Sequence, residues 1–130
     1  QFGAHGTTFG GNPLASAVAR VALRKLGSDG IAANVGRQAQ AIRDGLDAIN
    51  RDLDLFAEVR GRGLMLGAVL KPACAGRAGE ILDHAAANGL LLLQAGPDVL
   101  RFVPALNIGD EDVAEGLSRL RASLQAFSAG

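Results

Sequence analysis

Apolar residues recur through the first half of the chain at the three- and four-residue spacing of amphipathic helices. The spacing predicts a first helix over residues 13–28, with Asn12 as its N-cap and Pro13 at its first position. A second apolar stripe predicts another helix over residues 31–49. Two consecutive helices are therefore expected before any strand.

The period then shortens towards two, which is typical of strands. Residues 56–60 and 64–70 are predicted as two strands separated by the glycine-rich residues 61–63. Residues 90–94 and 99–103 are predicted as two more, and a Gly-Pro-Asp turn between them favours a hairpin. These segments predict a small sheet in the second half of the chain.

Two further helices complete the pattern. One is predicted over residues 75–88, and the last begins near Asp110, where three successive acids suit the positive end of a helix dipole. The order of elements predicts an α+β fold, a small mixed sheet covered by helices. We expect residues 1–30 to form a loop and connecting helix, and residues 31–130 to form a small α+β domain.

Composition narrows the class of protein. A chain of 130 residues with 48% hydrophobic residues, 20% charged residues and zero formal net charge is typical of one globular domain. It lacks the basic surplus of a nucleic-acid binder and the roughly 20 apolar residues of a membrane span. Cys74 is the single cysteine, so we expect a reducing, cytoplasmic location. The chain starts at Gln1 without a signal-like stretch, so it is expected to begin inside a longer protein.

Two adjacent hydroxyls, Thr7 and Thr8, lie between glycines just before the first helix. Glycines let backbone amides approach an anion, hydroxyls donate to phosphate oxygens, and a helix N-terminus favours negative charge. The loop therefore fits a phosphate group. It also fits a glycine-rich turn in which the threonines only cap their own backbone, and glycine-rich loops by themselves are weak signals of a binding site.

Arg101 is the charged residue within the apolar segment 99–103. A guanidinium is well suited to grip a carboxylate through two parallel hydrogen bonds. Strand alternation also allows Arg101 simply to point outward together with Val99 and Val103. Both interpretations remain open on the residues alone.

Other polar residues have simpler structural interpretations. His5 has no acid or nucleophile at a suitable spacing and is expected to brace its loop. His84 is expected on the helix surface, and Arg60 and Arg62 are expected to flank a glycine turn in structural roles. The acids at 110–112 are expected to cap a helix, with no metal assigned to them.

The run from His5 to Pro13, His-Gly-Thr-Thr-Phe-Gly-Gly-Asn-Pro, resembles the segment that follows the cofactor lysine in class III aminotransferases. The resemblance continues through residues 58–67 and 99–112 and so covers nearly the whole chain. It implies the C-terminal small domain of a fold-type I pyridoxal 5'-phosphate enzyme, preceded by a loop and helix from the large-domain and dimer side. A homodimer with a cofactor site shared across its interface is implied as well.

The resemblance assigns roles to particular residues. It implies that Thr8 contacts the cofactor phosphate of the neighbouring subunit, that Thr7 lies beside bound substrate, and that Arg101 binds a substrate carboxylate. The lysine that holds the cofactor is expected upstream of this chain, because neither Lys25 nor Lys71 stands at the family's position. No catalytic residue is therefore assigned within these residues, and alone they are expected to be inactive.

The implied reaction moves the δ-amino group of N-acetylornithine to 2-oxoglutarate, a step of arginine biosynthesis. Class III enzymes that act on succinylornithine, ornithine or 4-aminobutyrate share the same frame and remain alternatives. A different class of function is also open: a non-catalytic α+β module for oligomerisation or regulation.

Overall fold

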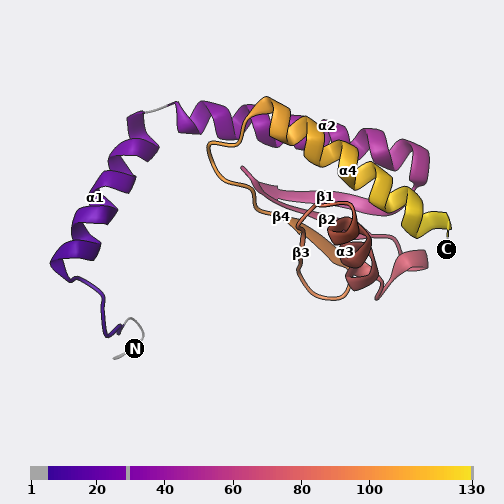
Figure 1. Ribbon diagram of the computed structural model, residues 1–130, viewed down its shortest axis with the longest axis horizontal. Coiled ribbons are helices and arrows are strands. Elements are labelled where there is room, and N and C mark those ends of the chain that lie inside the picture. Colours follow the sequence, from indigo (N-terminus) through magenta and orange to yellow (C-terminus); the bar gives the residue numbers. More distant parts are fainter. Residues whose placement is uncertain (1–5, 29, 130) are drawn as a thin grey trace. The chain divides into compact units, whose positions relative to one another are not determined.

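The computed structural model describes residues 6–28 and 30–129. The chain divides into two compact units, Gln1–Ala32 and Ala33–Gly130. Its elements are drawn in Figure 1 and follow in the order α1 (Pro13–Ser28), α2 (Ile31–Leu53), β1 (Phe56–Arg62), β2 (Met65–Leu70), the 3-10 helix η1 (Pro72–Cys74), α3 (Ala78–Ala87), β3 (Leu93–Gln94), β4 (Val99–Phe102) and α4 (Asp110–Ala129).

Helix α1 of the first unit begins as the sequence predicts. The backbone N–H of Ala15 donates to Oδ1 of Asn12 at 2.9 Å, which satisfies one of the free donors in the first turn. The N–H of Ser16 donates to the Asn12 carbonyl at 3.0 Å, the first backbone bond of the helix. The Asn12 side chain also donates to the Phe9 carbonyl and so ties the preceding loop to the helix start. The predicted N-cap is confirmed.

The second unit contains a four-stranded sheet in the order β1-β2-β4-β3. Each pair of neighbouring strands in it is antiparallel. The α+β class is confirmed, but the expectation of a mixed sheet is wrong. Two tight hairpins, β1-β2 and β3-β4, force opposite directions on their strands. After the longer connection through α3, strand β3 runs in the same direction as β2. However, β4 lies between them, so no parallel pair forms.

Alternation along the strands divides the sheet into a covered and an uncovered face. On the covered face Leu66, Ala68 and Leu100 are almost fully buried against residues of three helices. The helical side of this core is formed by Ile42, Leu46 and Ile49 of α2, Ala78 and Ile81 of α3, and Leu120, Leu124 and Phe127 of α4. The uncovered face carries exposed Met65 and Arg101. Within the described part of the chain, the second unit therefore presents one open face of its sheet.

Helices α2 and α4 lie side by side and run in the same direction (Figure 1). Gln38 of α2 donates to Asp110 at the start of α4, and Arg121, near the middle of α4, donates to Asp52 near the end of α2 at 2.5 Å. Between these bonds a Cβ on Gly45 would lie 2.4 Å from Cδ1 of Leu117, so the missing side chain makes room for the Leu117 side chain. The pairing holds the start of α4, and with it the segment that leaves β4, against α2.

Element boundaries differ from the sequence prediction at several points. Strand β1 continues to Arg62, and a two-residue turn at 63–64 replaces the predicted turn at 61–63. Strand β3 is shorter than predicted because 90–92 is irregular, although Leu90 and Leu92 pack against the core. Helix α3 begins only at Ala78, because a turn at residues 75–76 follows η1 and precedes the helix. Among the described helices, none is long and apolar enough to cross a membrane.

Candidate carboxylate and phosphate site

The two threonine hydroxyls in the loop before α1 differ in their contacts. Oγ1 of Thr7 accepts a hydrogen bond from the backbone N–H of Gly10, so this side chain caps its own loop. The Thr8 hydroxyl has no hydrogen-bond partner among residues 6–28 and 30–129, and the residue is exposed. Thr8 is therefore the hydroxyl available to an anion. His5, which was expected to brace this loop, lies outside the described residues.

Arg101 lies in β4 between two other strands of the sheet. It pairs with Gly67 of β2 on one side and with Leu93 of β3 on the other. The side chain points to the uncovered face, as do Val99 and Val103, and it is exposed. Within the described part of the chain, its guanidinium forms no hydrogen bond or ion pair. The structure thus leaves a planar, five-donor cation free at the surface of a rigid sheet.

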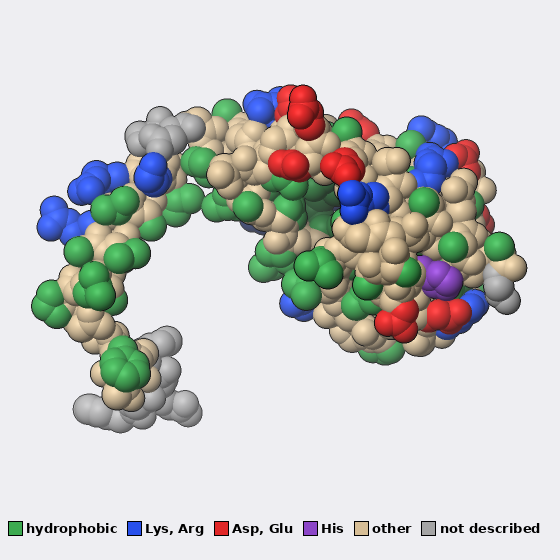
Figure 2. Space-filling model, viewed as in Figure 1, with side chains coloured by type: hydrophobic (Ala, Val, Ile, Leu, Met, Phe, Trp, Pro, Cys, Tyr) green, Lys and Arg blue, Asp and Glu red, His purple; other side chains and the backbone are tan. Residues whose placement is uncertain are grey.

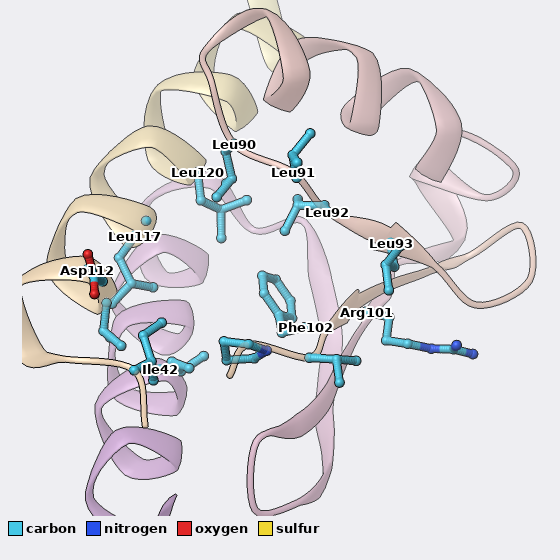
Figure 3. A pocket seen from close by; sticks show the side chains of 15 residues that line it. Ile42, Leu90, Leu91, Leu92, Leu93, Arg101, Phe102, Asp112, Leu117 and Leu120 are labelled. Carbon is cyan, nitrogen blue, oxygen red and sulfur yellow. The ribbon is translucent and has the colours of Figure 1, made fainter. Parts of the chain in front are cut away.

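A pocket of about 200 Å³ opens beside this strand, between β4, the segment before β3 and the start of α4 (Figure 3). Its wall is apolar, and its charged lining residues are Arg101 and Asp112. Figure 3 shows the Arg101 guanidinium directed away from the leucines and Phe102. The apolar wall is formed by Ile42, Leu90, Leu91, Leu92, Leu93, Phe102, Val103, Pro104, Ile108, Val113, Leu117 and Leu120. Arg101 therefore stands at the rim of the pocket.

Surface charge elsewhere does not single out another site. On the face of the second unit seen in Figure 2, acidic and basic side chains are interspersed rather than gathered by sign. Asp110 accepts from Gln38 and lies 3.6 Å from Nε of Arg37, so it is engaged at the α2–α4 contact. No group of three or more His, Cys, Asp or Glu among residues 6–28 and 30–129 is arranged to hold a metal ion.

The remaining candidates from the sequence have structural contacts. Lys71 pairs with Asp54. His84 was expected on the surface but is half-buried, since α3 packs on α4 and the His84 ring meets the Phe127 ring edge-on at 6.4 Å. Hydrogen bonds from Arg77 to Glu80 at 2.7 and 2.8 Å lower the pKa of the Glu80 carboxyl and raise the pKa of Arg77. These groups stabilise the unit rather than form a site.

The position of Arg60 differs from the sequence prediction. It lies within β1, not beside a turn, and it faces the same uncovered side of the sheet as Arg101. Nη1 of Arg60 lies 3.1 Å from Oε1 of Glu58, two residues earlier on the same strand. Strand alternation alone predicts that Arg60 and Glu58 share one face of the sheet, but only the register across β2 relates Arg60 to Arg101.

Comparison with known proteins agrees with the fold. The model of the family Aminotransferase class-III matches residues 1–124, and the chain belongs to this family. It is 70% identical to the acetylornithine aminotransferase of Xanthomonas campestris pv. campestris. The alignment spans 129 residues, which are 99% of this chain and 32% of that protein. The chain thus spans about a third of the length of the curated relatives it matches.

A solved structure and a second relative extend the comparison. The crystal structure of N-acetylornithine aminotransferase from Stenotrophomonas maltophilia K279a superposes with a TM-score of 0.88 at 71% identity, covering 92% of this chain and 33% of that one. The succinylornithine transaminase of Yersinia enterocolitica is 45% identical over 123 residues, 95% of this chain and 30% of that protein. The family resemblance seen in the sequence is confirmed.

Proposed function

We propose that the longer protein containing this chain is an aminotransferase that moves the δ-amino group of N-acetylornithine to 2-oxoglutarate in arginine biosynthesis. The observation that carries the proposal is Arg101, an exposed guanidinium without a partner among the described residues, held on a central strand. An oxo acid presents the planar carboxylate that such a group binds in two parallel hydrogen bonds. The choice of amino donor is supported by about 70% identity to relatives named for acetylornithine.

Pyridoxal 5'-phosphate is the cofactor we propose, and the N-terminal loop fits its phosphate. The Thr8 hydroxyl is exposed and has no hydrogen-bond partner among the described residues, and it lies a few residues before the N-terminus of α1, where backbone donors favour an anion. When bound, the cofactor supplies an electron sink at the carbon that carries the amino group. Thr8 donates to a phosphate oxygen, and Thr7 lies beside the substrate. Following the family pattern, the cofactor belongs to the neighbouring subunit of a cytoplasmic homodimer.

The two parts of the chain have different tasks in this proposal. Residues 1–30 form the phosphate-binding loop and its connecting helix, and residues 31–130 form the small domain that carries the carboxylate clamp. Neither Lys25 in α1 nor Lys71, which is paired with Asp54, is assigned to the cofactor. The 130 residues alone are accordingly inactive, and a non-catalytic module remains the competing function.

The amino donor is tested by steady-state kinetics of the full-length protein with 2-oxoglutarate as acceptor. We expect kcat/KM for N-acetylornithine to exceed the values for succinylornithine, ornithine and 4-aminobutyrate by at least about tenfold, because binding differences of this size distinguish related substrates. A higher kcat/KM for succinylornithine would transfer the assignment to that donor. Absence of amino transfer from every donor would favour the non-catalytic module.

Thr8→Val removes a hydroxyl and leaves the shape of the side chain. We expect the Kd of the full-length protein for pyridoxal 5'-phosphate to rise by about three- to tenfold, the usual cost of one hydrogen bond. The measurement is titration of the apo protein with cofactor, followed by absorbance. Equal Kd values for the Thr8 variant and the unaltered protein would refute the phosphate contact.

A further inference from the structure

The C-terminal end of α3 contains the dipeptide Asn88–Gly89, and Asn88 is the only asparagine of the chain that glycine follows. In such a dipeptide the backbone nitrogen of the glycine can attack the side-chain amide carbon of the asparagine, since no Cβ on the glycine hinders its approach. Ammonia leaves, a cyclic succinimide forms, and water opens the ring to aspartate or isoaspartate. Both residues are exposed, so water can reach them.

The way α3 ends requires the glycine that makes this dipeptide reactive. Gly89 has a φ of 72°, in the left-handed region that commonly closes helices. Its N–H donates to the Ala86 carbonyl at 3.0 Å, and the N–H of Leu90 donates to the Ala85 carbonyl at 2.8 Å. A Cβ on Gly89 would also collide with Nη1 of Arg119. A larger residue would disturb both the backbone and this contact, so the labile dipeptide is built into the helix end.

The folded structure holds the dipeptide in an unreactive arrangement. Ring closure needs Cβ of Asn88 and the nitrogen of Gly89 to eclipse each other about the Cα–C bond of Asn88. The Asn88 ψ of 11° keeps these two atoms well apart in torsion. The Gly89 N–H is also bound to Ala86, and the side-chain nitrogen of Asn88 donates to the His84 carbonyl at 3.0 Å. The reaction therefore requires the end of α3 to open first.

Arg119 of α4 holds this end of α3 closed. Its Nη1 donates to the Gly89 carbonyl at 2.9 Å and to the Asn88 carbonyl at 3.3 Å. Nε of the same guanidinium donates to Glu115, one turn earlier on α4, at 3.0 Å, which fixes the direction of the side chain. Rotation about the Cα–C bond of Asn88 carries the Asn88 carbonyl away from Arg119. Opening thus breaks hydrogen bonds from a charged donor in addition to the bonds of the helix end.

We propose that Asn88 is a modification site at which the chain deamidates, and that Arg119 sets the rate by holding the Asn88–Gly89 peptide. The inference does not depend on the aminotransferase function proposed above. The side-chain nitrogen of Asn88 leaves as ammonia and a water oxygen takes its place, so the reaction needs no other reactant. The isoaspartate product adds a methylene to the main chain directly before residues 90–93, which line the pocket beside Arg101.

The test is peptide mapping by mass spectrometry after the folded full-length protein has been incubated at mildly alkaline pH, which favours deprotonation of the attacking nitrogen. We expect Asn88 to deamidate faster than the other asparagines of this chain, which serve as references in the same digest. Arg119→Gln should raise the rate at Asn88 by about three- to tenfold, the effect of losing hydrogen bonds from a charged donor. Arg121→Gln is the matched control, because Arg121 lies on the same helix but donates to Asp52 of α2. It should leave the rate unchanged.

Unfolding in urea separates the chemistry of the dipeptide from the effect of the fold. In urea the unaltered protein and both variants should deamidate Asn88 at one common rate, at least about tenfold faster than the folded unaltered protein. Glu115→Gln is a milder change that leaves Arg119 in place but weakens its orientation, so in the folded protein it should give a smaller acceleration than Arg119→Gln.

Three results would overturn the proposal. Absence of deamidation at Asn88 in the folded Arg119 variant would remove the modification site. Equal acceleration by Arg119→Gln and Arg121→Gln would trace the effect to overall stability and remove the role of Arg119. Asn88→Gln lengthens the side chain and disfavours the ring, so a mass gain that persists in this variant's peptide would place the reaction at another residue.

Discussion

Replacing Arg101 with alanine in the full-length enzyme should raise KM for 2-oxoglutarate by about ten- to a hundredfold, or roughly 1.4 to 2.8 kcal/mol, with no loss of folded protein. The guanidinium is exposed and has no partner within the described part of the chain, so its removal leaves no buried group unsatisfied. The effect therefore falls on the ligand. Steady-state kinetics at varied 2-oxoglutarate, with the amino donor saturating, measures it.

Two variants sharpen this prediction. Arg101→Lys keeps one positive charge and loses the two parallel hydrogen bonds, so KM should lie between those of the alanine variant and the unaltered enzyme. Arg62→Ala removes an arginine from the same face of the sheet and should leave KM unchanged. An alanine variant with an unaltered KM would mean that Arg101 is a surface residue without a role in acceptor binding.

Gly61→Ala should lower the free energy of unfolding by about 3 kcal/mol or more, because a strained φ alone costs roughly 1–3 kcal/mol. Gly61 has a φ of 128°, and a Cβ there would lie 2.1 Å from the backbone oxygen of Met65. Its own carbonyl accepts a hydrogen bond from Arg43 at 2.9 Å, which ties β1 to α2. The clash is with backbone, so relief requires moving β1 or β2.

Gly36→Ala is the matched control for this prediction, since it makes the same chemical change within α2. A Cβ on Gly36 would meet nothing within 4 Å. The control should raise the free energy of unfolding by about 0.5–1 kcal/mol through helix propensity and a less flexible unfolded chain. Urea denaturation followed by circular dichroism measures both variants. Similar values for the two variants would contradict the geometry of the β1-β2 hairpin.

Much of the fold follows from local signals in the sequence. The first helix was predicted at its observed bounds, because Asn12, Pro13 and a following apolar stripe specify its start, and Gly27 indicates its end. The direction of neighbouring strands was predicted less well. It depends on β4 entering between β2 and β3, a pairing between residues far apart in the sequence that no local pattern reports. The apolar run at 90–92 predicts a strand but is irregular in the structure. Apolarity does not distinguish the two, because buried irregular segments are as apolar as buried strands.

The candidate site was predictable only where a residue was unusual in its own segment of the sequence. Arg101 stands out as a charge in an apolar strand, and family resemblance added the carboxylate. Arg60 carries no such signal, because the glycines at 61–63 predict a turn that ends its strand. The observed turn falls later and extends β1 through Arg62. Only the register across Gly67 then relates the two arginines.

The strand order has a consequence for how the protein is made. Strand β2 is a central strand, but its neighbour β4 follows it in the chain only after η1, α3 and β3. At a synthesis rate of about 5–20 residues per second, β2 waits a few seconds on the ribosome with one edge unpaired. An unpaired edge is a template for other strands. During that interval the unpaired edge of β2 is open to chaperones and to aggregation, and the arrival of β4, which carries Arg101, ends it.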